Sequence, residues 1–225
     1  VSAIQKYTAT IRGVRLQDIR QAAYVYRRFP LFSIWAGLLN SIGTQAPIIL
    51  FTVFFGAAEA GLFFISNRIL AAPMSVIGNA IGHSFLAGAA EAQRTGTLEK
   101  KARNIVYKLL FVIIGPALLI AVSGREIFSL VLGENWAEAG LMAQWLTPMI
   151  IAQFITSPIG QLLAVKDRQA VGAVLQALLT SLRISSIVIG QLYFDVVITV
   201  ALYSLASSVG YMLFLYFSLK CKARQ

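Results

Sequence analysis

Two arginines could do chemistry in this sequence, because each lies inside a segment otherwise apolar enough to cross a bilayer. Arg68 lies between residues 61 and 90, and Arg183 lies between residues 169 and 194. A guanidinium stays charged, and its planar fork of N–H donors pairs with the oxygens of phosphates and carboxylates. Burying such a cation without a partner is costly. The two arginines therefore predict an anion-attracting site within the membrane.

Each arginine also has a structural alternative. Arg68 follows Gly61 by about 10 Å of helix, so its side chain can extend to water at the membrane surface. Arg183 lies about ten residues or more from either end of its segment, where such snorkelling reaches least well. For Arg183, the alternative is a bond to backbone carbonyls that a kinked neighbouring helix leaves without donors.

The elements that must position these arginines are apolar helices. The chain of 225 residues is 58% hydrophobic and 12% charged, with a mean hydropathy of +0.75, whereas soluble domains are about 25% charged. About 20 apolar residues in a helix cross the hydrocarbon core. The segments long enough are 31–55, 61–90, 104–123, 139–165, 169–194 and 196–219. We predict an all-α integral membrane protein with six transmembrane helices.

Three of these segments carry a stripe of small and polar residues at helical spacing. The stripes lie on the faces of Arg68 and Arg183 and on one face of the first segment. We predict that both arginines are cavity cations that bind substrate. The polar residues predicted to line the cavity are Asn40, Thr44, Ser75, Asn79 and Gln176. Gly78 and Gly82 form a small-residue spacing that is explained by close helix packing.

The basic residues predict the topology. Sixteen of the nineteen Lys and Arg residues fall before the first segment, in the second and fourth connections, or in the tail. The other three connections hold Arg125 and most of the acidic residues. By the positive-inside rule, both ends are cytoplasmic. The net charge of +10 follows from this topology, and the sequence contains no motif that reads nucleic acid.

Catalytic and metal-binding patterns are missing from the sequence. The six segments contain no Asp or Glu, so a proton- or sodium-coupling carboxylate would have to lie elsewhere. One histidine, His83, and one cysteine, Cys221, cannot form a metal cluster. We therefore expect no cofactor and no metal, and an enzyme is the weaker class.

The chain divides into three predicted parts. Residues 1–29 form a basic cytoplasmic linker with an interfacial amphipathic helix over Leu16–Phe29, residues 30–220 form the six-helix lobe, and residues 221–225 form a cytoplasmic tail. Because the chain begins at Val1 and shows no signal-peptide pattern, we expect it to be the C-terminal part of a longer membrane protein.

Several short motifs resemble one known family. They are the run YRRFP at residues 26–30, Phe55-Gly56 before a short turn, Ala60-Gly61, and Asn67-Arg68 followed by Pro73. Residues 132–169 (LGENWAEAGLMAQWLTPMIIAQFITSPIGQLLAVKDRQ) add a Leu-Gly-x-x-Trp-x-x-Ala-Gly segment and a Ser-Pro helix. As a set, covering nearly the whole chain from residue 26, they resemble the Wzx-like polysaccharide and O-antigen flippases of the MOP exporter superfamily.

The resemblance implies a fold and a function. Such exporters have two six-helix lobes that rock around a central cavity, and this chain resembles the second lobe. The implied activity is flipping of a polyprenyl-diphosphate-linked oligosaccharide across the bacterial inner membrane. The implied partners are this anionic lipid-linked oligosaccharide, membrane lipids and the N-terminal lobe. Arg68 lies in the matching Asn-Arg motif, whereas Arg183 is a candidate only because of its depth.

Three other functions compete with this one. A drug or cation antiporter of the same superfamily would favour carboxylates in the membrane, where this sequence has arginines. A membrane-embedded glycan polymerase or ligase would need long outward loops with catalytic residues, but the predicted loops are short. A structural membrane subunit leaves the two arginines unexplained.

Overall fold

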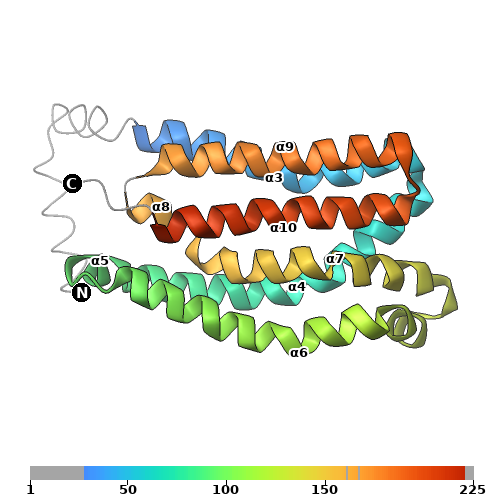
Figure 1. Ribbon diagram of the computed structural model, residues 1–225, viewed down its shortest axis with the longest axis horizontal. Helices are drawn as coiled ribbons and strands as arrows, with labels where there is room; N and C mark the ends of the chain where they lie inside the picture. Colours follow the sequence, from blue (N-terminus) through green and yellow to red (C-terminus); the bar gives the residue numbers. More distant parts are fainter. Residues whose placement is uncertain (1–27, 161, 167, 221–225) are drawn as a thin grey trace, which may run out of the picture.

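The computed structural model describes residues 28–160, 162–166 and 168–220, and every long element in these ranges is a helix (Figure 1). The predicted amphipathic helix, apart from its last two residues, and the predicted tail at 221–225 lie outside the described residues. The elements are α3 (Arg28–Phe55), α4 (Ala57–Ala87), α5 (Ala89–Arg94), α6 (Leu98–Leu132), η1 (Glu134–Trp136), α7 (Ala137–Thr156), η2 (Ser157–Ile159), α8 (Leu162–Val165), α9 (Gln169–Tyr193) and α10 (Val196–Lys220).

Among the described residues, six helical stretches are long and apolar enough to cross a membrane, which confirms the predicted fold class. They are Gly37–Phe55, Ala57–Ala87, Leu98–Leu132, Glu134–Ile159, Gln169–Tyr193 and Val196–Lys220. The first and last described residues lie at the same end of the bundle (Figure 1). This is the arrangement that an even number of crossings requires.

The predicted limits of the third span are wrong. Residues 104–123 were expected to be membrane helix and residues 124–138 a connection, but α6 continues to Leu132. Its 35 residues extend over about 52 Å, more than the roughly 30 Å of a hydrocarbon core. The backbone groups of a helix form hydrogen bonds within the helix. A helix can therefore continue past charged residues near its ends, where those side chains reach water. Ser123, with φ −121° and ψ 22°, marks a kink where the two stretches join.

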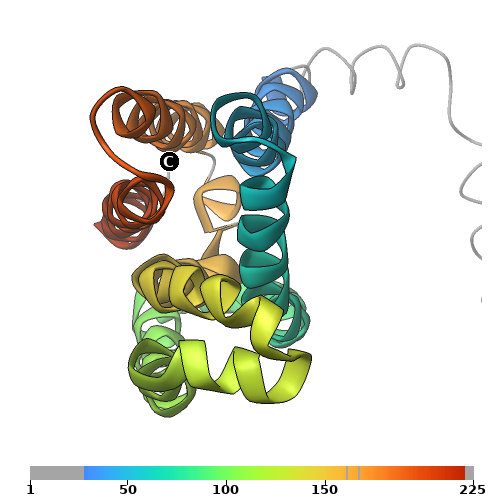
Figure 2. The same ribbon diagram turned by 90° about the vertical axis from the view of Figure 1, so that its right-hand side faces the viewer.

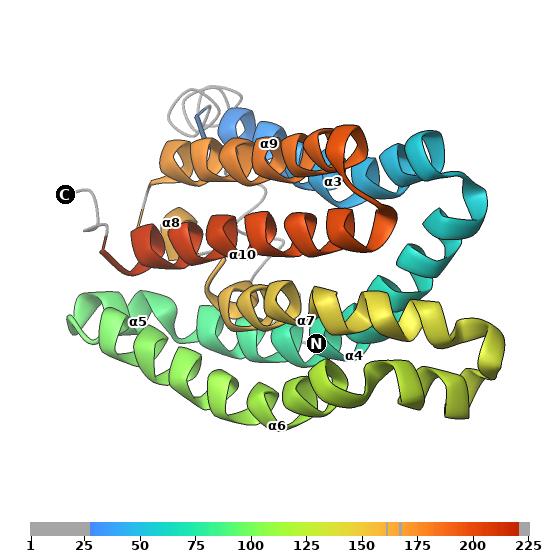
Figure 3. The same ribbon diagram turned by 45° about the vertical axis from the view of Figure 1, so that its right-hand side comes forward.

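The helices pack around α7, which is the most deeply buried of them. Helices α4, α6 and α10 pack against α7, α9 packs against α10 and α3, and α3 packs against α4. Seen along the bundle, α4 runs from the side of α3 to the side of α6 and α7 (Figure 2). The oblique view shows α3, α9 and α10 on one side and α6 on the other (Figure 3).

The two ends of the bundle differ in charge and in the length of their connections. At the acidic end, which carries Glu59, Glu134 and Asp195, Gly56 alone joins α3 to α4. Gly56 has φ +89° and Gly133, before η1, has φ +102°, values that glycine adopts without strain. The basic end contains α5 and α8 and carries the lysines and arginines of residues 94–108, 166–168 and 220.

Of the three buried apolar clusters among the described residues, the two larger ones hold most of the helices together. Toward the acidic end, Phe51 stacks on Phe63 with 4.3 Å between ring centroids, and Tyr203 of α10 packs edge-on against both. Toward the basic end, Phe85 of α4, Leu109 of α6 and Phe154 of α7 belong to one buried cluster. These contacts fix α3, α4, α6, α7 and α10 around the polar residues described next.

Candidate functional site

Arg183 is buried between three helices, with 2% of its surface exposed. From α9, its Nη1 donates to the backbone carbonyl of Gly43 on α3 at 3.0 Å. Its Nη2 donates to the hydroxyl of Tyr211 at 2.7 Å, and its Nε donates to the hydroxyl of Ser207 at 3.3 Å, both on α10. The guanidinium carbon also lies 5.1 Å from the centre of the Tyr211 ring. The fork of Arg183 therefore joins α3, α9 and α10.

The carbonyl that Arg183 binds is one that a proline leaves without a donor. In a regular helix, the Gly43 carbonyl would accept from the amide of residue 47, and that residue is Pro47. Gly43 also allows α9 to approach closely, since a Cβ there would lie 2.7 Å from the hydroxyl of Thr180. Arg183 thus supplies the missing donor, which is the contact that the structural alternative predicted.

Further polar contacts join α3 and α9. Thr180 donates to the carbonyl of Leu39 at 3.0 Å. The amide of Gln176 donates to the side-chain oxygen of Asn40 at 3.4 Å, so two residues predicted to line one cavity do lie side by side. Thr44 is exposed, and its hydroxyl donates to the Asn40 carbonyl of its own helix. The polar stripes of the first and fifth spans therefore face each other.

Arg68 lies in a different environment from Arg183. It is exposed on α4, about 16 Å along the helix from Ala57, because α4 begins four residues before the predicted start of this span. Among the described residues, no hydrogen bond or ion pair to Arg68 is present. Its guanidinium is therefore open to lipid, to water or to another part of the protein.

A small cavity of about 140 Å³, lined by both polar and apolar side chains, lies between α4 and the end of α7. Ser75 and Asn79, both predicted cavity residues, line it from α4, and Gln153 and Ser157 line it from the other side. Hydroxyls and amides can exchange hydrogen bonds with the hydroxyls of a sugar. Side chains of this kind are suited to binding a polyol.

The close approach at this cavity depends on the glycine pair of α4. A Cβ at Gly78 would collide with the Ser157 hydroxyl, and one at Gly82 would lie 3.3 Å from the Pro158 Cα. The Ser157 hydroxyl donates to the Phe154 carbonyl at 3.2 Å. In a regular helix this carbonyl would accept from the amide of residue 158, but Pro158 has no N–H. The Gly78-x-x-x-Gly82 spacing therefore serves helix packing, as predicted.

The predicted residues other than Arg68 thus fall at two places in the bundle. Asn40, Gln176 and Arg183 lie along α3 and α9, whereas Ser75 and Asn79 lie between α4 and α7. Neither arginine lines the cavity at Ser75. That both arginines bind substrate stays a prediction. Gln153 and Ser157 were not predicted from the sequence, although their spacing of four places them on one helical face.

The comparison with protein families shows which family the chain belongs to. A family described as polysaccharide biosynthesis protein matches residues 7–140, more than half of the sequence. The chain belongs to the polysaccharide biosynthesis protein family. The resemblance seen in the sequence is thereby confirmed at the level of polysaccharide biosynthesis. Searches of curated proteins and of solved structures found no match.

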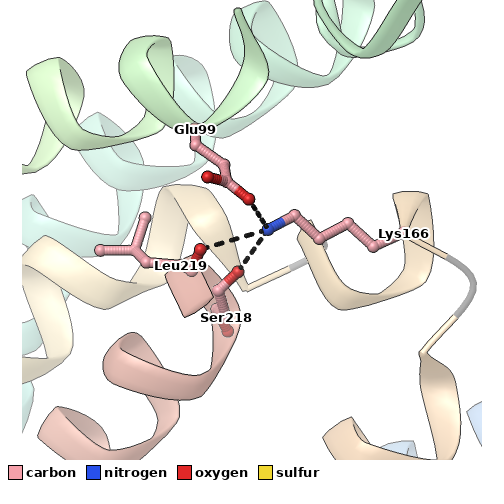
Figure 4. A network of polar contacts seen from close by, with 4 residues as sticks. All are labelled: Glu99, Lys166, Ser218 and Leu219. Carbon is pink, nitrogen blue, oxygen red and sulfur yellow. Dashed lines mark hydrogen bonds and ion pairs between the residues drawn. The ribbon is translucent and has the colours of Figure 1, made fainter. Parts of the chain in front are cut away.

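In this polysaccharide biosynthesis protein, a buried lysine ties the basic end of the bundle together (Figure 4). Lys166, directly after α8, is 2% exposed. Its ammonium group donates to Glu99 of α6 at 3.2 Å and to the carbonyls of Ser218 and Leu219 at 3.1 and 3.4 Å. Carbonyls in the last turn of a helix lack amide partners within the helix. Lys166 therefore caps α10 and joins it to α6, a role that the sequence analysis did not assign.

Proposed function

We propose that this chain is one lobe of a transporter that flips a polyprenyl-diphosphate-linked oligosaccharide across the bacterial inner membrane. The transport step belongs to the synthesis of a surface polysaccharide such as lipopolysaccharide. Membership of the polysaccharide biosynthesis protein family and six membrane-spanning helices support this proposal. In the proposed mechanism, this lobe and an N-terminal lobe rock against each other, so that a polar cavity opens to each side in turn.

The observation that carries the proposal is the place of the polar side chains. Ser75 and Asn79, both exposed, and the half-buried Gln153 line a hollow between α4 and α7, while the connections at the acidic end are very short. A glycan polymerase or ligase needs catalytic groups in its connections, but Gly56 alone joins α3 to α4, and two residues join α9 to α10. The chemistry of the described residues thus concerns passage through the bundle.

The distribution of charge favours an anionic substrate. Within the described helices, Glu59, Glu99 and Glu138 lie in first turns and Glu126 lies near the acidic end of α6, while Arg68 and Arg183 lie well inside α4 and α9. A cation antiporter would favour the reverse arrangement. We assign Arg68, which is exposed on α4 and does not line the cavity at Ser75, as a cation for the diphosphate or an acidic sugar, because its guanidinium has no partner among the described residues. We also assign the basic end to the cytoplasm by the positive-inside rule.

Replacing the two cavity amides tests this function. The full-length protein with Asn79→Leu and Gln153→Leu is expressed in a bacterium that lacks its own exporter. Surface polysaccharide and cytoplasm-facing lipid-linked oligosaccharide are then measured. We expect export to fall at least tenfold while the lipid-linked intermediate accumulates.

A matched control and an overturning result complete this test. Gln45→Leu makes the same chemical change at an exposed position of α3 that does not line the cavity, so it should leave export near normal. Normal export by the double variant, at a normal protein level, would show that the cavity does not serve transport.

A further inference from the structure

A second cavity, of about 440 Å³, lies at the basic end between the last turns of α4 and the first turns of α6. It is separate from the cavity at Asn79. Helix α5 follows directly after it, at the corner where α4 turns toward α6 (Figure 3). The lining residues are Ile81, Ser84, Phe85, Gly88, Lys101, Asn104, Ile105 and Lys108.

The polar side of this cavity is cationic. Lys101, Asn104 and Lys108 recur at intervals of three and four residues, so they share one face of α6. Both lysines are exposed, and within the chain as described neither has an acidic partner. None of the described residues that line it is acidic. Two ammonium groups beside one hollow attract an anion with several acceptor oxygens, and Ser84 and Asn104 add neutral donors.

The other side of the cavity is apolar. Phe85 is buried and Ile81 and Ile105 are partly buried, so a ligand here meets cations and hydrocarbon together. Lys108 lies about 15 Å along α6 from Leu98. The lysines therefore extend from the end of the bundle toward its interior, the range of depths that a lipid headgroup and the start of its acyl chains occupy. A free phosphate ion would leave the apolar wall unused.

We propose that this cavity binds the phosphate group of an anionic phospholipid from the surrounding bilayer. Lys101 and Lys108 hold the phosphate oxygens, and Ile81, Phe85 and Ile105 contact the glycerol and the first part of the acyl chains. Basic pockets between membrane helices on the cytoplasmic side recognise headgroups in this way. The site holds a lipid of the cytoplasmic leaflet at the joint between α4 and α6.

Lipid binding by the full-length protein tests the site. The protein is released from membranes in mild detergent and titrated with phosphatidylglycerol, and bound lipid is counted by native mass spectrometry. We expect the variant Lys101→Gln, Lys108→Gln to bind phosphatidylglycerol at least fivefold more weakly. Lys101→Arg, Lys108→Arg keeps the charge and should retain binding, and circular dichroism checks that every variant is folded.

The matched control removes the same charge from the same helix. Lys100 and Arg103 do not line the cavity, and Arg103 points about 160° away from Lys101 on an ideal helix. Lys100→Gln, Arg103→Gln should leave binding within twofold. If this control lost as much phosphatidylglycerol binding as Lys101→Gln, Lys108→Gln, the effect would be one of general surface charge, and the proposed site would be refuted. Equal binding of phosphatidylcholine and phosphatidylglycerol by the unaltered protein would also overturn it.

Competition separates the three sources of phosphate. A polyprenyl diphosphate stands for the proposed transport substrate, and inorganic phosphate stands for a free anion. We expect neither to displace phosphatidylglycerol at equal concentration. Displacement by the polyprenyl diphosphate would reassign the cavity to the transported lipid, and displacement by inorganic phosphate would reduce it to an anion site. The proposal does not depend on the transport function, because lipid binding is measured without export.

Discussion

Arg183 on α9 donates to the carbonyl of Gly43 on α3 at 3.0 Å, four residues before the proline that leaves this carbonyl unpaired. The contact joins two elements that are 140 residues apart in sequence. It shows how a charged side chain is retained in an apolar helix: its donors satisfy acceptors that the bilayer would leave without partners. Arg183 and Pro47 therefore form one structural unit.

Removing the guanidinium should destabilise the bundle. Arg183→Gln loses three hydrogen bonds between helices. If each contributes the roughly 0.6 kcal/mol typical of membrane helices, we expect a loss of about 2 kcal/mol. In a Pro47→Ala background, the new amide can donate to the Gly43 carbonyl. The same change should then cost about 0.6 kcal/mol less, because the bond to the Gly43 carbonyl is the one that the new amide replaces. Reversible unfolding in detergent micelles measures all four proteins of this cycle.

A second proline provides the control for this cycle. Pro148 on α7 is also inside a membrane helix, but Arg183 makes no hydrogen bond near it. Pro148→Ala should therefore show no coupling to Arg183→Gln. If Pro47→Ala and Pro148→Ala coupled equally to the arginine change, the link between Arg183 and the Gly43 carbonyl would be refuted.

The spans were predictable because their signal is local. Apolar length predicts a membrane helix, and the spacing around Arg183 correctly predicted a polar face that meets another helix at Asn40. The length of α6 was not predictable from hydropathy. Charges such as Arg125 end an apolar run without ending the helix, since Arg125 pairs with Glu138 in the exposed part of the bundle.

The partners of buried groups could not be predicted in the same way. Arg183 had two interpretations in the sequence, and only the packing of α9 on α3 shows which proline lies beside it. Lys166 looked like one more basic residue of a connection. Its burial follows from the position of the end of α10 and of Glu99, 67 residues away in sequence.

Replacing Lys166 should destabilise the end of α10 more than replacing its ionic partner, Glu99. Lys166→Met keeps much of the volume but removes the donor to the last turn of α10, so we expect faster hydrogen exchange at residues 215–220. Glu99→Gln should have a smaller effect, because the Glu99 side chain is 49% exposed and the carbonyl contacts of Lys166 remain. Hydrogen-exchange mass spectrometry in nanodiscs compares the two. A larger effect of Glu99→Gln would contradict the capping role.

Gly78→Ala should loosen the contact between α4 and the end of α7. The new methyl group collides with the Ser157 hydroxyl, which also serves the Phe154 carbonyl, so we expect a loss of about 1–3 kcal/mol. Gly61→Ala is the control on the same helix, since no atom lies within 4 Å of its added Cβ. That change should be neutral or stabilise by up to about 1 kcal/mol. Similar melting shifts for both variants would show that close packing at Gly78 is unimportant.

Replacement by lysine should be tolerated at Arg68 and harmful at Arg183. Arg183 uses the geometry of its fork to reach Gly43, Ser207 and Tyr211, and a lysine ammonium cannot reproduce these directions. Arg68 makes no such contacts among the described residues, so as a cation for the substrate it should act mainly through its charge. We therefore expect Arg68→Lys to keep most of the export activity and Arg68→Gln to lose it.

Arg183→Lys should instead lower protein stability almost as much as Arg183→Gln. Export per folded molecule and melting temperature, measured on the four variants, separate the two roles. Full export by Arg68→Gln would leave Arg68 as a residue that merely snorkels to the membrane surface.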